Sequence, residues 1–329
     1  MIGGRGHDAL LAMSARRAIL IIKLSALGDF VQALAACAMI RRAHAGDTLT
    51  VLTTAPYRSL AEACPYFDEV MIDERPKLTN PLAVLRLARR LRAPRFDRVY
   101  DLQTADRSAF YFRLMRRWDG GPQWSGIAPG CSHPHANPHR DSMHTLERQA
   151  EQLDMAGITP PDPLLPPDLS WVPSPDRALL DALPDRFALL VPGGAPHRPR
   201  KRWPAASFGA LAGRLAASGV TPVLLGTAAE AAEAAQIRQS CPLAIDLLNR
   251  TSLLDIAGLG RRAVCAVGND TGPMHLLAAA GCPSVVLFSD SSDPALCAPR
   301  GRAVTVLRRD DLARLPVDQV WETIDQRLL

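Results

Sequence analysis

Two series of alternating apolar runs and helical stretches constrain the fold of these 329 residues more than any other feature. Continuous apolar strands separated by helices are typical of a parallel sheet that is covered on both faces. The sequence therefore predicts an α/β fold. In the first half we expect strands at Ile19–Leu24, Leu49–Thr53, Val70–Ile72 and Arg98–Leu102, and helices ending near His44 and Ala63.

A proline-rich segment divides the two series. Residues 159–175 contain prolines at a density that neither a helix nor a central strand tolerates, so we expect an extended linker. The resulting domains are residues 1–165 and 176–315, followed by a terminal helix at 316–329. The strands expected in the second half are 187–191, 220–225, 263–267, 284–288 and 303–307, and the helices are 205–217, 228–240, 273–280 and 317–329. Ligands of such sheets bind beyond the carboxyl ends of the strands.

Composition excludes several classes of protein. The chain is 47% hydrophobic and 22% charged, as globular proteins are, and its 5% aromatic content is too low for a base-stacking platform. No apolar run reaches the length of a transmembrane helix, and the N-terminus lacks the pattern of a signal peptide, so we expect a cytoplasmic protein. Only three of the 38 basic residues are lysine. This bias fits an anionic partner and equally fits a GC-rich genome.

Asp29 is the first candidate for chemistry. It follows the first strand, after Gly28, at the expected start of a helix. A carboxylate there is stabilised as the anion and would serve as a general base beside the cleft. It would equally serve as a helix cap.

A glycine turn after the strand 187–191 is the second candidate. Gly193 and Gly194 precede a basic stretch, and their backbone N–H groups together with the cations would hold phosphate. The alternative is a solvated basic loop. The cations are Arg198, Arg200, Lys201 and Arg202.

A polar turn that opens a helix after the strand 263–267 is the third candidate. Thr271 and Gly272 would begin the helix, leaving free N–H groups for a diphosphate, and His275 would donate to phosphate. Asp270 either orients those N–H groups or only ends the strand. A cluster of histidines between Cys131 and His144 lacks the spacing of a zinc site, so we expect no metal.

These motifs together resemble the bacterial heptosyltransferases of glycosyltransferase family 9. The motifs are Ser25-Ala-Leu-Gly-Asp-Phe-Val-Gln, the loop from Pro192-Gly-Gly to Lys201-Arg-Trp-Pro, and Gly268-Asn-Asp-Thr-Gly-Pro-Met-His, in family order. The resemblance implies a GT-B fold, with two Rossmann-like domains and a last helix that packs back on the N-terminal domain. It also implies metal-independent, inverting transfer of heptose from ADP-heptose to a lipid-linked Kdo-type saccharide of the lipopolysaccharide inner core. The enzyme would need no cofactor and would work at the cytoplasmic face of the inner membrane.

The resemblance also assigns roles. Asp29 would be the general base and Lys201 would neutralise the leaving diphosphate. The donor would further contact Gly193, Gly194, Asp270, Thr271, Gly272 and His275. Glu230 or Glu233 would hold the ribose, and the sequence does not choose between them. Candidates for acceptor contacts are Arg58, Arg107 and Arg140.

One departure bears on the donor. Family members often have Phe-Gly-Pro after the strand 284–288, whereas this chain has Ser289 and Asp290, which adds a negative charge near the expected diphosphate. A family 9 transferase with another nucleotide sugar is therefore an alternative. A non-catalytic protein that binds nucleotide or anionic lipid on the same fold is another. A nucleic-acid role lacks any motif.

Overall fold

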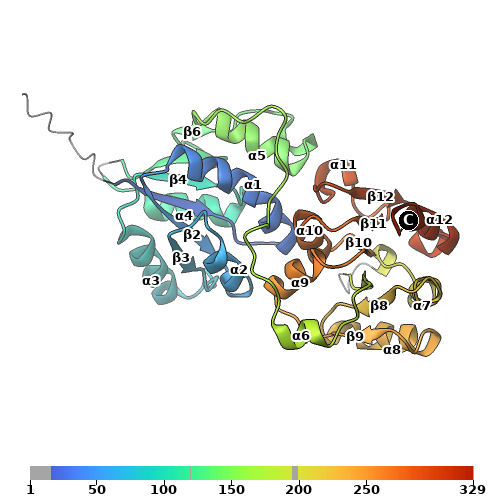
Figure 1. The fold of residues 1–329 in the computed structure, drawn as a ribbon. Helices are drawn as coiled ribbons and strands as arrows, with labels where there is room; N and C mark the ends of the chain where they lie inside the picture. Colours follow the sequence, from blue (N-terminus) through green and yellow to red (C-terminus); the bar gives the residue numbers. More distant parts are fainter. Residues whose placement is uncertain (1–15, 119, 195–198, 329) are drawn as a thin grey trace, which may run out of the picture.

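The computed structural model describes residues 16–118, 120–194 and 199–328, and they form two six-stranded parallel sheets (Figure 1). The first sheet has the order β3-β2-β1-β4-β5-β6. Its strands are β1 (Ala18–Ile22), β2 (Thr48–Thr53), β3 (Glu69–Ile72), β4 (Arg98–Asp101), β5 (Gln123–Gly126) and β6 (His133–Pro134). Its main helices are α1 (Leu27–Ala43), α2 (Arg58–Ala63), α3 (Pro81–Arg92), α4 (Asp106–Met115) and α5 (Thr145–Asp154).

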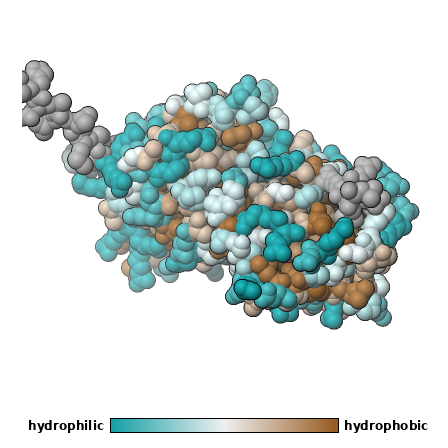
Figure 2. All heavy atoms as spheres, in the orientation of Figure 1, coloured by the Kyte–Doolittle hydropathy of each residue, from teal (hydrophilic) through white to brown (hydrophobic). Residues whose placement is uncertain are grey.

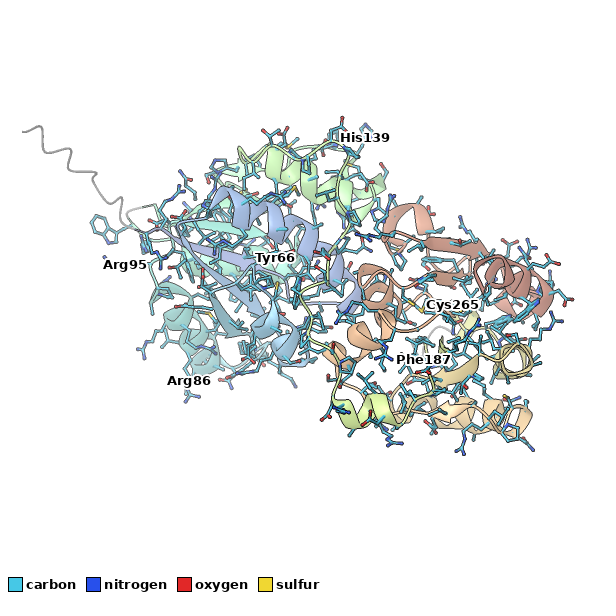
Figure 3. The ribbon with its side chains drawn as sticks, viewed as in Figure 1. Tyr66, Arg86, Arg95, His139, Phe187 and Cys265 are labelled. Carbon is cyan, nitrogen blue, oxygen red and sulfur yellow. The ribbon has the colours of Figure 1, made fainter. Side chains whose placement is uncertain are left out.

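The second sheet repeats this topology, with the order β12-β11-β10-β7-β8-β9. Its strands are β7 (Phe187–Val191), β8 (Thr221–Leu224), β9 (Ile245–Asp246), β10 (Cys265–Asn269), β11 (Ser284–Phe288) and β12 (Val304–Arg308). Its helices are α6 (Arg177–Asp181), α7 (Ala205–Ala217), α8 (Ala231–Ser240), α9 (Leu253–Gly260), α10 (Gly272–Ala279), α11 (Pro294–Cys297) and α12 (Val317–Leu328). Figure 3 labels Phe187 and Cys265, which belong to two paired strands at the centre of this sheet.

The central strands explain why the chain folds this way. Strands β1 and β7 are apolar throughout, and each pairs with a neighbour on both sides, so their side chains are buried on both faces. In each sheet the strand order reverses beside the first strand, between β1 and β4 and between β7 and β10. Ligands of doubly wound sheets bind at such a reversal. The α/β prediction is confirmed, and the loops that follow these four strands are where a site is expected.

The two domains share part of their core. Phe30 and Leu34 of α1 belong to the same buried cluster as Met274 and Leu277 of α10. The linker between the sheets is also packed rather than free, because Arg261 donates hydrogen bonds to carbonyl oxygens of residues 169, 172 and 173. The predicted domain boundaries at 165 and 176 fall within this connecting segment.

The terminal helix corrects one expectation. Within the described residues, α12 packs mainly on α7 of the C-terminal domain rather than on the N-terminal domain. Val320 and Ile324 are fully buried in a cluster with Phe208 and Leu211, and Arg214 pairs with Asp318. The apolar face of this amphipathic helix is thus satisfied within its own domain.

The described surface is mixed in character. Figure 2 shows hydrophilic residues over most of the visible face, with hydrophobic ones scattered among them. Among the described helices, none combines the length and the apolar character needed to cross a bilayer.

Candidate active site

The first turns of α1 and α10 meet where the two domains join. A Cβ on Gly28 would lie 2.7 Å from the His275 ring, and one on Gly272 would lie 2.7 Å from Cβ of Leu27. Only glycine therefore permits this approach at either position. Because the first N–H groups of a helix have no partner within it, two positive helix ends lie together at this junction.

Asp29 occupies the third position of α1. Its Oδ2 accepts a hydrogen bond from the Ala26 N–H at 3.0 Å, so it does cap the helix. Its Oδ1 has no hydrogen-bond partner among the described residues. The carboxylate therefore has one oxygen that holds the helix start and one that is available to accept a proton.

A cavity of about 190 Å³ lies beside Asp29. Three cations line it, Lys23, Arg140 and Arg148, together with Asp141. Lys23 is buried and donates to the Leu102 carbonyl oxygen at 3.1 Å, and its burial lowers the pKa of the ammonium group. This cationic excess suits an anionic ligand.

The arginines predicted for the acceptor fall into two groups. Arg140 lines the cavity and donates to Oγ1 of Thr104 at 3.2 Å. Arg58 is exposed on α2, 3.7 Å from Glu62, and Arg107 donates to the Tyr111 hydroxyl at 3.0 Å. Neither of these two arginines lines the cavity.

Sequence reasoning missed the residues that hold the loop before Asp29. Gln103 Oε1 accepts from the N–H groups of Leu24 and Ser25, at 2.9 and 3.2 Å. Asp101 is fully buried and accepts from the Gln103 and Thr104 N–H groups, and burial raises its pKa to about 6. The two carboxyl-end loops of β1 and β4 are thus tied to each other.

On the C-terminal side, Lys201 and Asp270 form an ion pair at 2.7 Å, and both side chains are largely buried. The Ser292 hydroxyl donates to the same carboxylate oxygen, also at 2.7 Å. The structure therefore brings together the basic stretch after β7 and the polar turn after β10. Arg198 of the same stretch lies outside the described residues.

Asn269, which sequence reasoning also missed, positions both loops. It is fully buried at the end of β10, and its Nδ2 donates to the carbonyl oxygens of Pro192 and Gly193 at 2.9 and 3.0 Å. Its Oδ1 accepts from the Trp203 N–H at 2.9 Å. A buried amide at a strand end, inside a motif already singled out, was the available signal.

The two candidate glutamates differ in their surroundings. Glu230 is buried, caps its helix by accepting from Thr227 N–H and Oγ1, and lies against Gly193, whose Cβ would be 3.1 Å from the carboxyl carbon. Glu233 pairs with Arg202 at 2.7 Å. Glu230 is thus the one beside the glycine turn.

His275 sits between the two helix starts. Its Nδ1 lies 3.2 Å from Nε2 of Gln32, which also donates to the Cys297 carbonyl oxygen at 3.0 Å. Because the amide nitrogen donates, the ring nitrogen accepts and the ring proton resides on Nε2. Burial lowers the pKa of His275 to about 4, so the ring is neutral near pH 7. Thr271, the residue before α10, donates from its hydroxyl to the Asn269 carbonyl oxygen.

The negative charge that Asp290 adds after β11 is balanced by a neighbouring arginine. Arg200 pairs with Asp290 at 2.8 Å, and Ser289 is buried with its hydroxyl accepting from the Ser291 N–H. The added carboxylate is therefore not left facing the diphosphate region as an unpaired charge.

The histidine-rich segment forms protein contacts. His135 pairs with Glu151 at 2.6 Å, and Nε2 of His144 lies 3.0 Å from the Ala298 carbonyl oxygen. Within the described residues there is no group of three or more histidine, cysteine or acidic side chains arranged to hold a metal.

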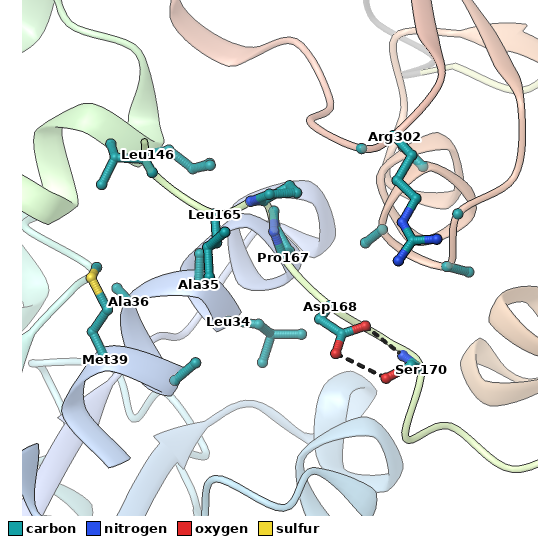
Figure 4. Close-up of a pocket in the computed structure, with 18 of the residues that line it drawn as sticks. Leu34, Ala35, Ala36, Met39, Leu146, Leu165, Pro167, Asp168, Ser170 and Arg302 are labelled. Carbon is teal, nitrogen blue, oxygen red and sulfur yellow. Dashed lines mark hydrogen bonds between the residues drawn. The ribbon is translucent and has the colours of Figure 1, made fainter. Parts of the chain in front are cut away.

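A larger cavity of about 780 Å³ lies between α1, the linker and the end of α10 (Figure 4). Its lining includes Met39, Leu165 and Arg302, and none of the predicted site residues. The cavity lined by predicted site residues is therefore the smaller one beside Asp29.

Comparison with known proteins adds the family. The model of glycosyltransferase family 9 (heptosyltransferase) matches residues 84–318. Lipooligosaccharide heptosyltransferase 2 of Haemophilus influenzae is 30% identical over 158 residues, which are 44% of this chain and 45% of that relative's length.

Two solved structures share the fold. The E. coli ADP-heptose lipopolysaccharide heptosyltransferase II superposes with a TM-score of 0.78 at 23% identity, over 94% of this chain and 98% of that one. The E. coli heptosyltransferase WaaC with ADP gives 0.76 at 22% identity, over 94% and 99%.

Proposed function

Because the chain belongs to glycosyltransferase family 9, the heptosyltransferase family, we propose that it transfers a heptose from ADP-heptose to a lipopolysaccharide inner-core saccharide. The acceptor is a lipid-linked Kdo-type sugar, and the reaction takes place at the cytoplasmic face of the inner membrane. The observation that carries this proposal is the junction of α1 and α10. There, Asp29 follows the glycine that touches His275, and a cationic cavity lies beside it.

In the proposed reaction, Oδ1 of Asp29 accepts the proton of the attacking acceptor hydroxyl. The hydroxyl oxygen bonds to the anomeric carbon from the face opposite to ADP, and the bond to the diphosphate breaks, which inverts the anomeric centre. Proton removal by a positioned carboxylate is general base catalysis. The Arg140 and Arg148 guanidinium groups support the acceptor, because they line the same cavity and suit its carboxylate or phosphate groups.

The leaving ADP gains negative charge as the bond breaks. Lys201 and the N–H groups at the start of α10 provide positive charge without a bound metal ion. Asn269 supports this role because it holds the Gly193 carbonyl in place, and Glu230 is the residue we assign to the ribose hydroxyls because it lies against that glycine.

The test is thermal-shift binding of ADP against UDP, GDP and CDP in the absence of divalent metal. Ligand at a hundredfold excess over its Kd should add about 2.7 kcal/mol to stability, which raises Tm by a few degrees. A shift with ADP alone makes ADP-heptose the donor to assay. A preference for another nucleotide would point to a different nucleotide-sugar donor, which is the alternative raised by the sequence departure at Ser289 and Asp290.

A protein that only binds nucleotide or anionic lipid is the second candidate. Such a protein would show the ADP shift but no transfer, and replacing Asp29 would then have no effect on any turnover. Consumption of ADP-heptose in the presence of a soluble Kdo-containing saccharide separates the two.

A further inference from the structure

Helix α3 carries apolar side chains on two opposite faces, and only one face packs on the domain. Leu87 and Leu91 are buried in the cluster beneath α3. Leu82 and Leu85 are 67% and 47% exposed. At 100° per residue they lie opposite the buried pair. Leu78, in the loop before the helix, is 66% exposed. The described chain thus presents three large apolar side chains to solvent within eight residues.

Cations surround these leucines. Residues 75–96 contain seven arginines and lysines and no acidic residue. Arg86 and Arg89 share the exposed face of α3, and neither side chain has a hydrogen-bond or ion-pair partner among the described residues. Figure 3 shows Arg86 on the outer edge of the N-terminal domain, away from the C-terminal domain. We use the name α3 surface for the region formed by Leu78, Leu82, Leu85, Arg86 and Arg89.

This surface is connected to the active-site loop. Arg75 donates from Nη2 to the Ser25 hydroxyl at 2.6 Å and to the Leu24 carbonyl oxygen at 3.3 Å. Ser25 lines the same cavity as Asp29. The α3 surface therefore begins three residues after a side chain that touches the loop leading into α1, the helix that carries the proposed general base.

We propose that the α3 surface docks the protein on an anionic lipid bilayer. Leucines inserted among the acyl chains leave water, and arginines beside them are attracted to anionic headgroups. A lipid surface fits better than a folded acidic partner, because it requires only apolar insertion and net charge. With no acidic residue between 75 and 96, there is no charge pattern to set a register with another protein. The inference rests on the proposed function only in identifying the docked bilayer as the one that holds the acceptor.

Vesicle cosedimentation tests the docking itself. The probes are vesicles of phosphatidylglycerol and phosphatidylethanolamine, with phosphatidylcholine vesicles as the neutral comparison. The variants are Leu82→Ser with Leu85→Ser, and Arg86→Gln with Arg89→Gln. All four side chains are exposed, so these variants should keep the wild-type Tm. We expect binding to anionic vesicles to fall about 30-fold for the arginine pair, at roughly fivefold per charge, and at least about tenfold for the leucine pair.

Matched controls lie on the other domain. Leu243 is 69% exposed, and Arg238 and Arg250 are exposed in the same half of the chain. Leu243→Ser and the pair Arg238→Gln with Arg250→Gln should change vesicle binding less than about twofold. Docking by the α3 surface is overturned if the wild-type protein does not bind anionic vesicles. It is also overturned if the control variants lose as much vesicle binding as the α3 variants do.

A second measurement separates this inference from the proposed function. The α3 variants should bind ADP and transfer to a water-soluble acceptor as wild type does, while transfer to an acceptor embedded in vesicles falls with vesicle binding. Equal loss on both acceptors would refute docking as the role of this surface. Normal vesicle binding without any ADP binding would instead refute the proposed donor and leave the docking intact.

Discussion

Replacing Asp29 by asparagine separates the two roles that the structure gives this residue. Oδ2 caps α1 by accepting from the Ala26 N–H, while Oδ1 is the proposed proton acceptor. Asparagine keeps an oxygen for the cap, but its amide does not take up a proton at neutral pH. General bases contribute about 10²- to 10⁴-fold, so kcat for heptose transfer should fall by that factor in Asp29→Asn.

Asp29→Ala is the matched comparison because it removes both roles. Loss of a helix cap costs about 1 kcal/mol, which lowers Tm by about 2–4 °C in a domain of 150–250 residues. Asp29→Asn should therefore match wild type in Tm, while Asp29→Ala should melt lower. Both variants should bind ADP as wild type does, because the residues assigned to the donor lie on the other domain.

The assay is ADP release from ADP-heptose with a saturating soluble acceptor, together with ADP titration by thermal shift. Turnover of Asp29→Asn within tenfold of wild type would refute the general base. Parallel loss of ADP binding would show that the residue acts through the donor site instead. A lower Tm in Asp29→Asn would mean that the cap requires the charge and that the two roles are not separable.

Three further predictions concern the donor side. Lys201→Met should weaken ADP affinity by about 10- to 100-fold, because it removes a charged hydrogen-bond donor and leaves Asp270 without its cationic partner. A change below twofold in isothermal titration would contradict this prediction. Glu230→Gln should weaken ADP binding about tenfold, whereas Glu233→Gln, which removes the ion pair with Arg202 but leaves Arg202 bonded to the Gly194 carbonyl oxygen, should leave it within twofold; the reverse order would reassign the ribose. Folding lowers the pKa of His275 from 6.5 to about 4, so the folded protein binds fewer protons at this ring than the unfolded chain does. The contribution of His275 to the free energy of unfolding is therefore complete above pH 6.5 and is lost as the pH falls toward 4. His275→Gln should therefore lose about 3 kcal/mol less than wild type in urea unfolding between pH 7 and 4, and equal losses would show that the ring is not held neutral.

The sequence predicted the central strands because their side chains are buried on both faces, which leaves an unbroken apolar run. It did not predict α3, α4, α5, β5 or β6 in the first half, nor α6, α9, α11 or β9 in the second. In α3 an apolar stripe that includes Leu87 and Leu91 was present in the sequence but was not recognised, and Leu82 and Leu85 add apolar residues on the opposite, arginine-rich side. Strand β5 (Gln123–Gly126) is short and contains one large apolar residue, Trp124, so neither its length nor its pattern distinguishes it from a loop.

The site was predictable where a motif follows a strand and hidden where contacts join distant residues. Asp29 follows a central strand of the first sheet. Lys201 and Asp270 follow the paired strands β7 and β10, so strand order brings these two to one edge of the second sheet. Gln103 contacts the Ser25 loop although the two are 78 residues apart, and no pattern of sequence spacing predicts such a contact. For the same reason Arg58 and Arg140 were equivalent in the sequence, although the structure puts only Arg140 in the cavity.

The charge balance at the donor loop bears on how a diphosphate is selected. Three consecutive cations each have a carboxylate partner: Arg200 with Asp290, Lys201 with Asp270, and Arg202 with Glu233. The opposite charges of each pair largely cancel at a distance, so the loop attracts anions less than its number of basic residues implies. An incoming diphosphate must compete with Asp270 for Lys201, whereas the N–H groups at the start of α10 need no such exchange. Selectivity for the diphosphate therefore depends on the helix start, and Lys201 contributes most when the leaving group acquires charge that Asp270 does not offset.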